Sequence, residues 1–547
     1  MKQTNNMGRL SKAFLCTLIS SSILVSGCKV TIKGDDDAEE LVQSTVDTIA
    51  NGGSSDGSET NEPACDETLT SSGYRFPCDA IYIAPDADDG DDITNELLLA
   101  LFEIADDSVV VLPEGNFKVS ETITIAAASG LTLTGHGIHS TKLDFTGSTG
   151  DDGIRFEGGN DITARDFGVY ETNKNGIKAV GANGVHFTYT ATVWEGDLAE
   201  SQGAYGLYPV QSQNILIEHN YAYGSADAGI YVGQSNNIVV RDNTAKYNVA
   251  GIEIENSNKA DVYNNLAINN AAGILAFDLP GLEQAYGTNI RIFNNNVYAN
   301  NTENVGHGAV SIAPPGTGVL IFAVSGVEIY NNNITDNDTS AIELASYFMS
   351  DQDVANYPVN YGETIAKGWS PMIKNIYMHD NTIARNGDNP QGVLLQDVIA
   401  GYSSAYNSTG MPQVFPAILY DGIGELLSNA GALTDFNYLV GEDAAADGVN
   451  YNPYSAGDLL CANGNINGNT GPSYDDVNTG LVYGTNPFDA FNWDINGNPT
   501  PSLLIDKMVN NTFLNCELNR LPEAVVTFKG KVYGCTGDDQ AEPSCAL

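Results

Sequence analysis

A repeat of about 22 residues constrains the fold of this chain more than any other feature. Segments that begin with glycine open at Gly206, Gly229, Gly251 and Gly273, at spacings of 23, 22 and 22 residues, and a fixed period of this length marks a repeat architecture. In each opening the second and fourth residues are mostly apolar while the third varies, as in a strand with one buried face. A single coil cannot bury enough apolar surface to fold alone, so neighbouring coils must stack. The pattern predicts an all-β fold, a right-handed parallel β-helix.

An asparagine marker runs in phase with this repeat. In six repeats an asparagine follows an apolar residue by three positions, at Asn220, Asn243, Asn265, Asn295, Asn332 and Asn381. Stacked turns that repeat one asparagine can bond side-chain amides to the backbone along the stack. We therefore expect an asparagine ladder through the coils.

The N-terminal segment predicts export and lipidation. Basic residues precede an apolar run at 13–25, which is shorter than the roughly 20 residues that a membrane-spanning helix needs. The run ends in Leu24-Val-Ser-Gly-Cys28, which resembles the lipobox of bacterial lipoproteins. This resemblance implies that residues 1–27 are a signal peptide and that Cys28 is acylated. Lys29 resembles a signal for outer-membrane sorting, so the chain is expected to be anchored there through lipid.

Composition divides the rest of the chain into three parts. Residues 28–79 are acidic and polar, which is typical of a flexible tether. Residues 80–399 carry the β-helix and its N-terminal cap. Residues 400–547 lose the repeat phase and combine glycine- and asparagine-rich runs with four cysteines, so they are predicted to form C-terminal coils and a cap.

A short capping helix is predicted before the first strands. Asp91, Asp92 and Thr94 suit a helix N-terminus. One apolar helical face would then be formed by Leu97, Leu101, Ile104 and Ala105. The acidic loop 86–92 also has oxygen ligands that calcium prefers, but helix capping explains it more simply.

Longer loops interrupt the later coils. The strand pattern is expected to continue at residues 309–313 and 341–345, to give way to an inserted loop at 347–370, and to return at 372–386. Six cysteines follow the leader, and an exported protein can form disulfides. Their clustering favours Cys65 with Cys78 and two bridges among the last four, at Cys461, Cys516, Cys535 and Cys545.

The charge of the chain limits its partners. The formal net charge is −46, and such a surface repels nucleic acid and anionic lipid but attracts cations. We therefore expect no nucleic-acid partner.

Four strings resemble a bacterial family of envelope parallel β-helix repeat proteins. They are Gly203-Ala-Tyr-Gly-Leu-Tyr-Pro-Val, Asp227-Ala-Gly-Ile-Tyr-Val-Gly-Gln-Ser, Val249-Ala-Gly-Ile-Glu-Ile-Glu-Asn-Ser and Gly273-Ile-Leu-Ala-Phe-Asp-Leu-Pro. The resemblance covers residues 81–386 and implies an envelope location. It implies no reaction, but such proteins are often encoded beside a c-type dihaem cytochrome, which is therefore a candidate partner.

Stacking would place the third residue of each opening in one outward column, about 4.8 Å apart. The column is Arg155, Lys178, Tyr208, Tyr231, Glu253, Leu275, Ser311 and Glu343. Glu255 would lie beside it, and Tyr205, Asp227 and Asp278 would lie at the strand ends. Basic, aromatic and acidic side chains at this spacing predict an exposed groove for an extended ligand, most simply a polysaccharide.

Two chemistries fit these residues. Glu253 and Glu255 resemble the calcium-binding pair of chondroitinase-B-type β-helix lyases, although Lys178 and Arg155 would lie three and four coils away from Glu253. Hydrolysis would instead use two carboxyl groups about 5–10 Å apart. The candidate catalytic residues are Glu253, Glu255, Asp227 and Tyr231. Glu253 and Glu255 are also the candidate ligands of a calcium ion. The ligand-binding candidates are Tyr205, Tyr208, Lys178, Arg155 and Asp278.

The alternative function is a non-catalytic one. A β-helix can serve as a scaffold that docks a secreted redox protein such as the cytochrome. The sequence leaves open whether the groove processes a ligand, only binds it, or binds a protein.

Overall fold

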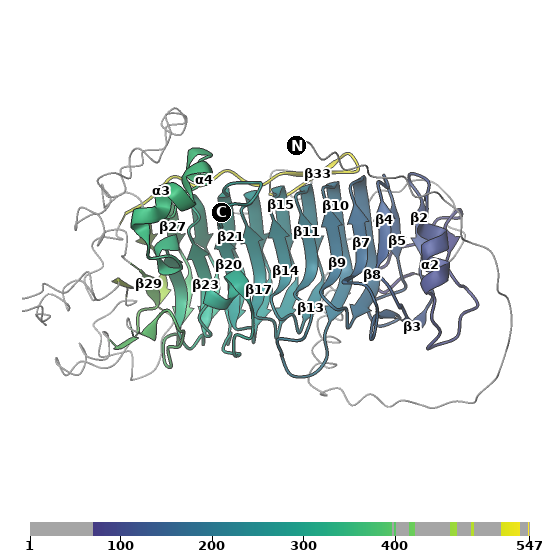
Figure 1. Ribbon diagram of the computed structural model, residues 1–547, viewed down its shortest axis with the longest axis horizontal. Coiled ribbons are helices and arrows are strands. Elements are labelled where there is room, and N and C mark those ends of the chain that lie inside the picture. Colours follow the sequence, from purple (N-terminus) through teal and green to yellow (C-terminus); the bar gives the residue numbers. More distant parts are fainter. Residues whose placement is uncertain are drawn as a thin grey trace, which may run out of the picture.

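The computed structural model describes residues 69–396, 399–400, 415–421, 460–467, 483–485, 516–535 and 545. In this part the chain is a parallel β-solenoid whose coils follow one another along the long axis (Figure 1). The predicted leader with Cys28, the tether as far as residue 68, Cys65 and much of the predicted C-terminal cap lie outside the described residues.

Each complete coil has three strands, one on each of three faces. The first face is a single parallel sheet of 11 strands. Its strands are β4 (Ile123–Ala126), β7 (Asp152–Glu157), β9 (Asn175–Val180), β11 (Tyr205–Val210), β14 (Ala228–Gly233), β17 (Ala250–Glu255), β20 (Ala272–Phe277), β23 (Thr317–Phe322), β26 (Ser340–Ala345), β29 (Ile418–Tyr420) and β32 (Tyr483–Thr485).

The second and third faces are joined by two long strands, β8 (Asn160–Tyr170) and β10 (Asn183–Val193), which turn the corner between them. The second face adds β1 (Ile81–Tyr82), β2 (Val109–Val111), β5 (Thr132–Thr134), β12 (Gln213–Glu218), β15 (Asn236–Arg241), β18 (Asn258–Tyr263), β21 (Thr288–Phe293), β24 (Val327–Tyr330), β27 (Ile376–His379) and β30 (Leu460–Asn463). The third face adds β3 (Gly115–Lys118), β6 (Thr141–Asp144), β13 (Tyr221–Tyr223), β16 (Thr244–Lys246), β19 (Leu266–Ile268), β22 (Asn296–Tyr298), β25 (Asn333–Thr335), β28 (Thr382–Ala384) and β31 (Ile466–Asn467).

The inner core confirms the predicted alternation. Ile252 pairs in register with Ile230 and Ile274, and all three side chains are fully buried. They belong to one apolar core that continues from Ile83 to Ala462. Each coil therefore buries its apolar residues against the coils on both sides, as a solenoid requires.

Two asparagine ladders run through the coils. The predicted ladder is confirmed, and Asn465 extends it beyond Asn381. A second ladder, which the sequence analysis did not identify, joins Asn248, Asn270, Asn300, Asn337 and Asn386. In both, each amide nitrogen donates to the next amide oxygen and to a backbone carbonyl of the preceding coil, so buried polar groups at the turns are paired.

The N-terminal cap contains the predicted helix, α2 (Thr94–Leu101). Asp92 Oδ1 accepts a hydrogen bond of 2.9 Å from the Thr94 backbone, and Leu97 and Leu101 are buried. The prediction was wrong for Ala105, which is exposed because the helix ends at Leu101.

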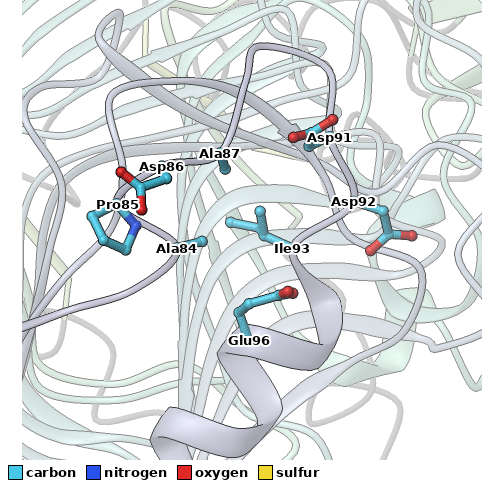
Figure 2. A pocket seen from close by; sticks show the side chains of 8 residues that line it. All are labelled: Ala84, Pro85, Asp86, Ala87, Asp91, Asp92, Ile93 and Glu96. Atoms are coloured by element: carbon cyan, nitrogen blue, oxygen red, sulfur yellow. The ribbon is translucent and has the colours of Figure 1, made fainter. Parts of the chain in front are cut away.

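The acidic loop before α2 lines a shallow pocket together with Ala84, Pro85 and Glu96 (Figure 2). Two of its carboxylates pair with nearby backbone: Asp91 Oδ2 accepts from the Asp88 backbone at 2.9 Å, and Asp92 Oδ1 accepts from the backbone of Thr94, the first residue of α2. Among the described residues no group of three or more His, Cys, Asp or Glu side chains is arranged to hold a metal ion. The hydrogen bond from the Thr94 backbone to Asp92 is consistent with the predicted role of this loop at the start of α2.

Residues 309–313 do not continue the stack, and this expectation was wrong. Residues 309–312 lie in a 3-10 helix, η1 (Gly308–Ile312), Ala313 follows it, and the strand of that coil is β23 instead. Strands at 341–345 and 376–384 are confirmed. The inserted loop between them contains η2 (Tyr347–Met349), η3 (Val354–Asn356), α3 (Tyr357–Asn360) and α4 (Gly362–Ala366).

The four C-terminal cysteines form two bridges, as expected, and their pairing, which the sequence left open, is Cys461–Cys516 and Cys535–Cys545. Cys78 is also disulfide-bonded. Residues 69–79, assigned above to the end of the tether, form a turn in which Phe76 is buried and Ser72 bonds Asp166 of the β-helix. In the described part of the chain, no helix has the length and apolar character needed to cross a bilayer.

Candidate functional site

The outward column of the first face exists as the spacing predicts, with one exchange. Arg155, Lys178 and Tyr208 pair in register on β7, β9 and β11. Tyr231 pairs with Glu253, and the column continues through Leu275 to Glu343. Leu320 of β23 takes the place expected for Ser311, because Ser311 lies in η1.

The middle of this column is buried, which corrects the expectation of an open groove. Only 1% of Glu253, 4% of Tyr231 and 7% of Glu255 is exposed to solvent. An apolar cluster that includes Val310, from the segment between β22 and β23, packs over Tyr231 and its neighbours. The segment between β22 and β23 therefore covers the part of the first face that the sequence suggested would be exposed.

Three tyrosine rings meet at the N-terminal side of this covered region. The ring centroid of Tyr205 lies 4.6 Å from that of Tyr208 and 4.5 Å from that of Tyr231, and Tyr208 lies 4.9 Å from Tyr231. Tyr205 and Tyr208 are partly exposed, whereas Tyr231 is buried. The tyrosines therefore lead from the surface to the interior of the site.

Three carboxyl groups lie behind these rings: Asp227, Glu253 and Glu255. Burial raises the pKa of Asp227 to about 7, although a hydrogen bond with Tyr205 opposes the rise. Burial, and then the nearby charge of Asp227, raises the pKa of Glu255 to about 8 and that of Glu253 well above its usual range. The cluster therefore holds protons near neutral pH, because an isolated buried charge is costly.

Hydrogen bonding in the carboxyl cluster is incomplete. Tyr231 donates its hydroxyl to Glu255 Oε2, whereas Asp227 Oδ1 and Glu253 Oε1 are buried and have no hydrogen-bond partner within the described residues. Unpaired buried oxygens are rare in folded proteins. The Glu255 carboxyl is thus already paired with Tyr231, and among the residues that the structure describes no group of three or more His, Cys, Asp or Glu side chains is arranged to hold a metal ion.

A basic group lies at the open end of the column. Lys178 Nζ lies 4.5 Å from the ring centroid of Tyr208 and 4.0 Å from Asp152 Oδ2. Arg155 forms ion pairs with Asp152 at 3.2 Å and with Glu157 at 2.8 Å, and about a third of its side chain is exposed. Burial lowers the pKa of Lys178, and the charge of Asp152 opposes the decrease. Lys178 is thus a partly buried cation beside an aromatic ring.

The remaining candidates lie apart from the tyrosines. Asp278 is buried and its Oδ1 accepts from the Gly287 backbone at 2.8 Å, so it organises the loop after β20. Glu343 is also buried and accepts from Thr317 Oγ1 at 3.0 Å. The structure thus brings together Lys178, the three tyrosines and three of the predicted carboxyl groups. Asp278 borders this cluster, because burial and then the nearby charge of Glu255 raise the pKa of Asp278 well above its usual range, whereas Glu343 lies outside.

Several solved structures are similar to the chain at low sequence identity. No curated protein matches the chain. Among solved structures, the A-module of a mannuronan C-5 epimerase from Azotobacter vinelandii is 15% identical, with 62% of this chain and 91% of that chain covered and a TM-score of 0.38. An alpha-1,3-glucanase from Streptomyces thermodiastaticus is 15% identical, with coverages of 63% and 51% and a TM-score of 0.37.

A fragment of gene product 12 from bacteriophage Phi29 is similar to the same degree, at 15% identity, coverages of 60% and 57% and a TM-score of 0.37. Residues 121–281 match the family model described as a right-handed beta helix region. This match and the three-faced coils show that the repeat forms a right-handed parallel β-helix.

Proposed function

We propose that the first face binds an extended polysaccharide at its open end, where Lys178, Tyr208 and Tyr205 lie. The observation that carries this proposal is the continuous contact from the Lys178 amine to the Tyr208 ring and on to the Tyr205 ring, at 4.5 and 4.6 Å. Aromatic faces can pack against sugar rings while their hydroxyl groups form hydrogen bonds. Strand spacing brings such groups close to one another along the stack.

The carboxyl cluster defines the inner limit of this binding surface. Asp227 is the most exposed of the three acids, so a bound sugar can reach it before it reaches Glu253 or Glu255. With a pKa of about 7, Asp227 can hold or release a proton at neutral pH. We propose binding as the primary activity, and Asp227 as the group through which any processing of the ligand would begin.

We further propose that binding takes place in the cell envelope, with the chain held at the outer membrane through Cys28. The lipobox-like string at residues 24–28 supports this location. Cys28→Ala should move the protein out of the membrane fraction. Unchanged membrane association would contradict the proposed anchor.

Calorimetric titration of the full chain with a panel of acidic and neutral polysaccharides tests the binding function. An acidic ligand should depend on the Lys178 amine, so Lys178→Gln should weaken its binding about tenfold, whereas a neutral ligand should respond less. A matched control is Lys259→Gln, because Lys259 is exposed on β18 of the second face. If no polysaccharide binds while the protein forms a stable complex with an envelope c-type cytochrome, the scaffold function would replace this proposal.

A further inference from the structure

A segment from the C-terminal part of the chain lies along the outer side of the second face. We call residues 516–535 the strap. It is tied to β30 by the Cys461–Cys516 disulfide, and its hairpin of β33 (Val526–Phe528) and β34 (Lys531–Tyr533) reaches β10 and β12 (Figure 1). The strap therefore runs back along the stack, against the order in which the coils follow one another.

Four backbone N–H groups of the strap donate to side chains of the second face. The bonds are Leu521 to Glu328 at 3.0 Å, Ala524 to Asp261 at 3.2 Å, Thr527 to Asn214 at 3.4 Å and Lys529 to Asp161 at 3.1 Å. The acceptors belong to β24, β18, β12 and β8, and the pairing order leaves one strand between each two of them. These four hydrogen bonds thus reach every second coil.

The spacing of every second coil is close to the length of three residues of an extended peptide. Two coil steps span about 9.6 Å, and three residues of extended chain span about 9.6–10.2 Å. Leu521 and Ala524 are three residues apart and their acceptors Glu328 and Asp261 lie in one column, so an extended peptide keeps these two donors in step with the coils. The step from Ala524 to Thr527 also takes three residues but moves across the face, because Asn214 lies two residues before the β12 position that is in register with Asp261. The final step to Lys529 takes two residues and enters the hairpin turn, where φ of Lys529 is +46°.

Apolar side chains of the strap fill the space between these bonds. Val526 and Phe528 are buried in a cluster with Leu216, Val239 and Tyr263 of the second face. In the same cluster the rings of Tyr263, Phe293 and Tyr330 stack on consecutive coils, with centroids 4.7 and 4.8 Å apart. The strap therefore covers a continuous apolar surface as well as pairing polar groups.

The two fully buried acceptors show why the strap belongs on this face. Asp261 and Glu328 are fully buried. Asp261 pairs with Arg291 at 2.8 and 2.5 Å, and Glu328 pairs with His379 at 3.0 Å and with Arg520 of the strap itself. Each carboxyl also takes a strap N–H, and an unpaired oxygen there would be costly.

We propose that the outer side of the second face is a binding surface for an extended peptide, that the strap is its ligand within the same chain, and that Cys461–Cys516 latches it in place. In a solenoid each coil contacts only its neighbours, so coils can unfold separately. The strap links β8 to β24 directly, and the latch carries this link to β30. The bound strap therefore makes distant coils unfold together.

Amide hydrogen exchange of the full chain tests the latch. In a Cys461→Ser, Cys516→Ser variant, the amides at 521–529 should exchange at least tenfold faster than in the wild type. The reason is that residue 516 of the strap is then no longer bonded to β30. Cys535→Ser, Cys545→Ser removes the other bridge, whose cysteines pack in the apolar cluster of the strap, and it should raise exchange at 521–529 much less than loss of the latch does. Equal exchange in the wild type and the first variant would overturn the latch.

A one-residue insertion tests the spacing rule. An alanine inserted after Glu523 places Leu521 and Ala524 four residues apart, so exchange at 521–529 should rise at least tenfold while β14 and β17 stay protected. Val525→Ala, at a site 37% exposed, keeps the spacing and should have no effect. Unchanged exchange after the insertion would overturn the spacing rule. Loss of protection in β14 and β17 as well would show that the strap is part of the folding core, which contradicts a bound ligand.

Discussion

The hydroxyl of Tyr231 donates a hydrogen bond to the Glu255 carboxyl of the next coil, and both side chains are buried. This pair lies within the interior of the first face rather than in an open groove. Ligand access is therefore expected at Lys178 and Tyr208, on the coils before it. The contribution of this buried pair to the free energy of unfolding can be measured.

Tyr231→Phe should lower the free energy of unfolding by about 1–2 kcal/mol, because the phenylalanine ring keeps the packing but removes the donor to Glu255. Tyr247→Phe is the control, since Tyr247 is 38% exposed on another side of the coil, and it should change stability by less than about 0.5 kcal/mol. Urea denaturation measures both. Equal loss of stability in the two variants would show that the Tyr231 hydrogen bond contributes nothing.

Ile252→Asp should destabilise the β-helix by several kcal/mol, because it places an unpaired charge between Ile230 and Ile274 in the inner core. Leu99→Asp makes the same kind of change on α2 at a side chain that is 75% exposed, and it should cost little. Thermal unfolding compares them. A small effect of Ile252→Asp would contradict the inward register of β17.

Asn270→Ala removes one member of the second asparagine ladder. Asn270 Oδ1 accepts from the backbone and side chain of Asn248, and its Nδ2 donates to Asn300 and to Ala245. Its loss should cost about 2–4 kcal/mol, since buried donors lose their acceptor. The exposed Asn296 gives a control, Asn296→Ala, expected to cost under about 0.5 kcal/mol. Similar unfolding midpoints for the two variants would exclude a stabilising role for this ladder.

The repeat made the architecture predictable from sequence. Gly251-Ile-Glu-Ile-Glu255 encodes an alternation that the structure reproduces in β17, and Asn220 marks a ladder because every coil repeats it. Asn248 belongs to an equally regular second ladder, which could have been found by testing for another asparagine in phase. Local, repeated signals were thus sufficient for the coil.

The site was less predictable because its exposure depends on segments that are distant in the sequence and pack over it. Glu253 has the sequence context of an outward residue, and it does point outward from β17, but the segment that contains Val310 packs over that region. Ser311 was misplaced for the same reason, since nothing in the local pattern separates η1 from a strand. The strap, likewise, meets residues more than 190 positions away in the sequence.

Glu343 gives the stability a defined pH dependence. Burial raises the pKa of Glu343 to about 8 from 4.5, so the folded state keeps a proton that the unfolded chain releases. The free energy of unfolding should therefore fall as the pH rises from about 5 to 8. Glu343→Gln should reduce this fall by about 3–4 kcal/mol, whereas Glu96→Gln at an exposed site should leave it unchanged. Urea denaturation at pH 5 and pH 8 measures the free energy of unfolding of each variant. An identical decrease in the wild type and in Glu343→Gln would mean that Glu343 is not protonated in the folded state.

The most direct test of the proposed function is a titration of the wild type, Tyr208→Ala and Tyr247→Ala with whichever polysaccharide the panel identifies. Tyr208 is partly exposed in the column, beside Lys178 and Tyr205, whereas Tyr247 is exposed elsewhere on the coil. Loss of the Tyr208 ring should weaken binding by about 1–3 kcal/mol, and Tyr247→Ala should bind like the wild type. Equal affinities of all three proteins would contradict a binding site on the first face.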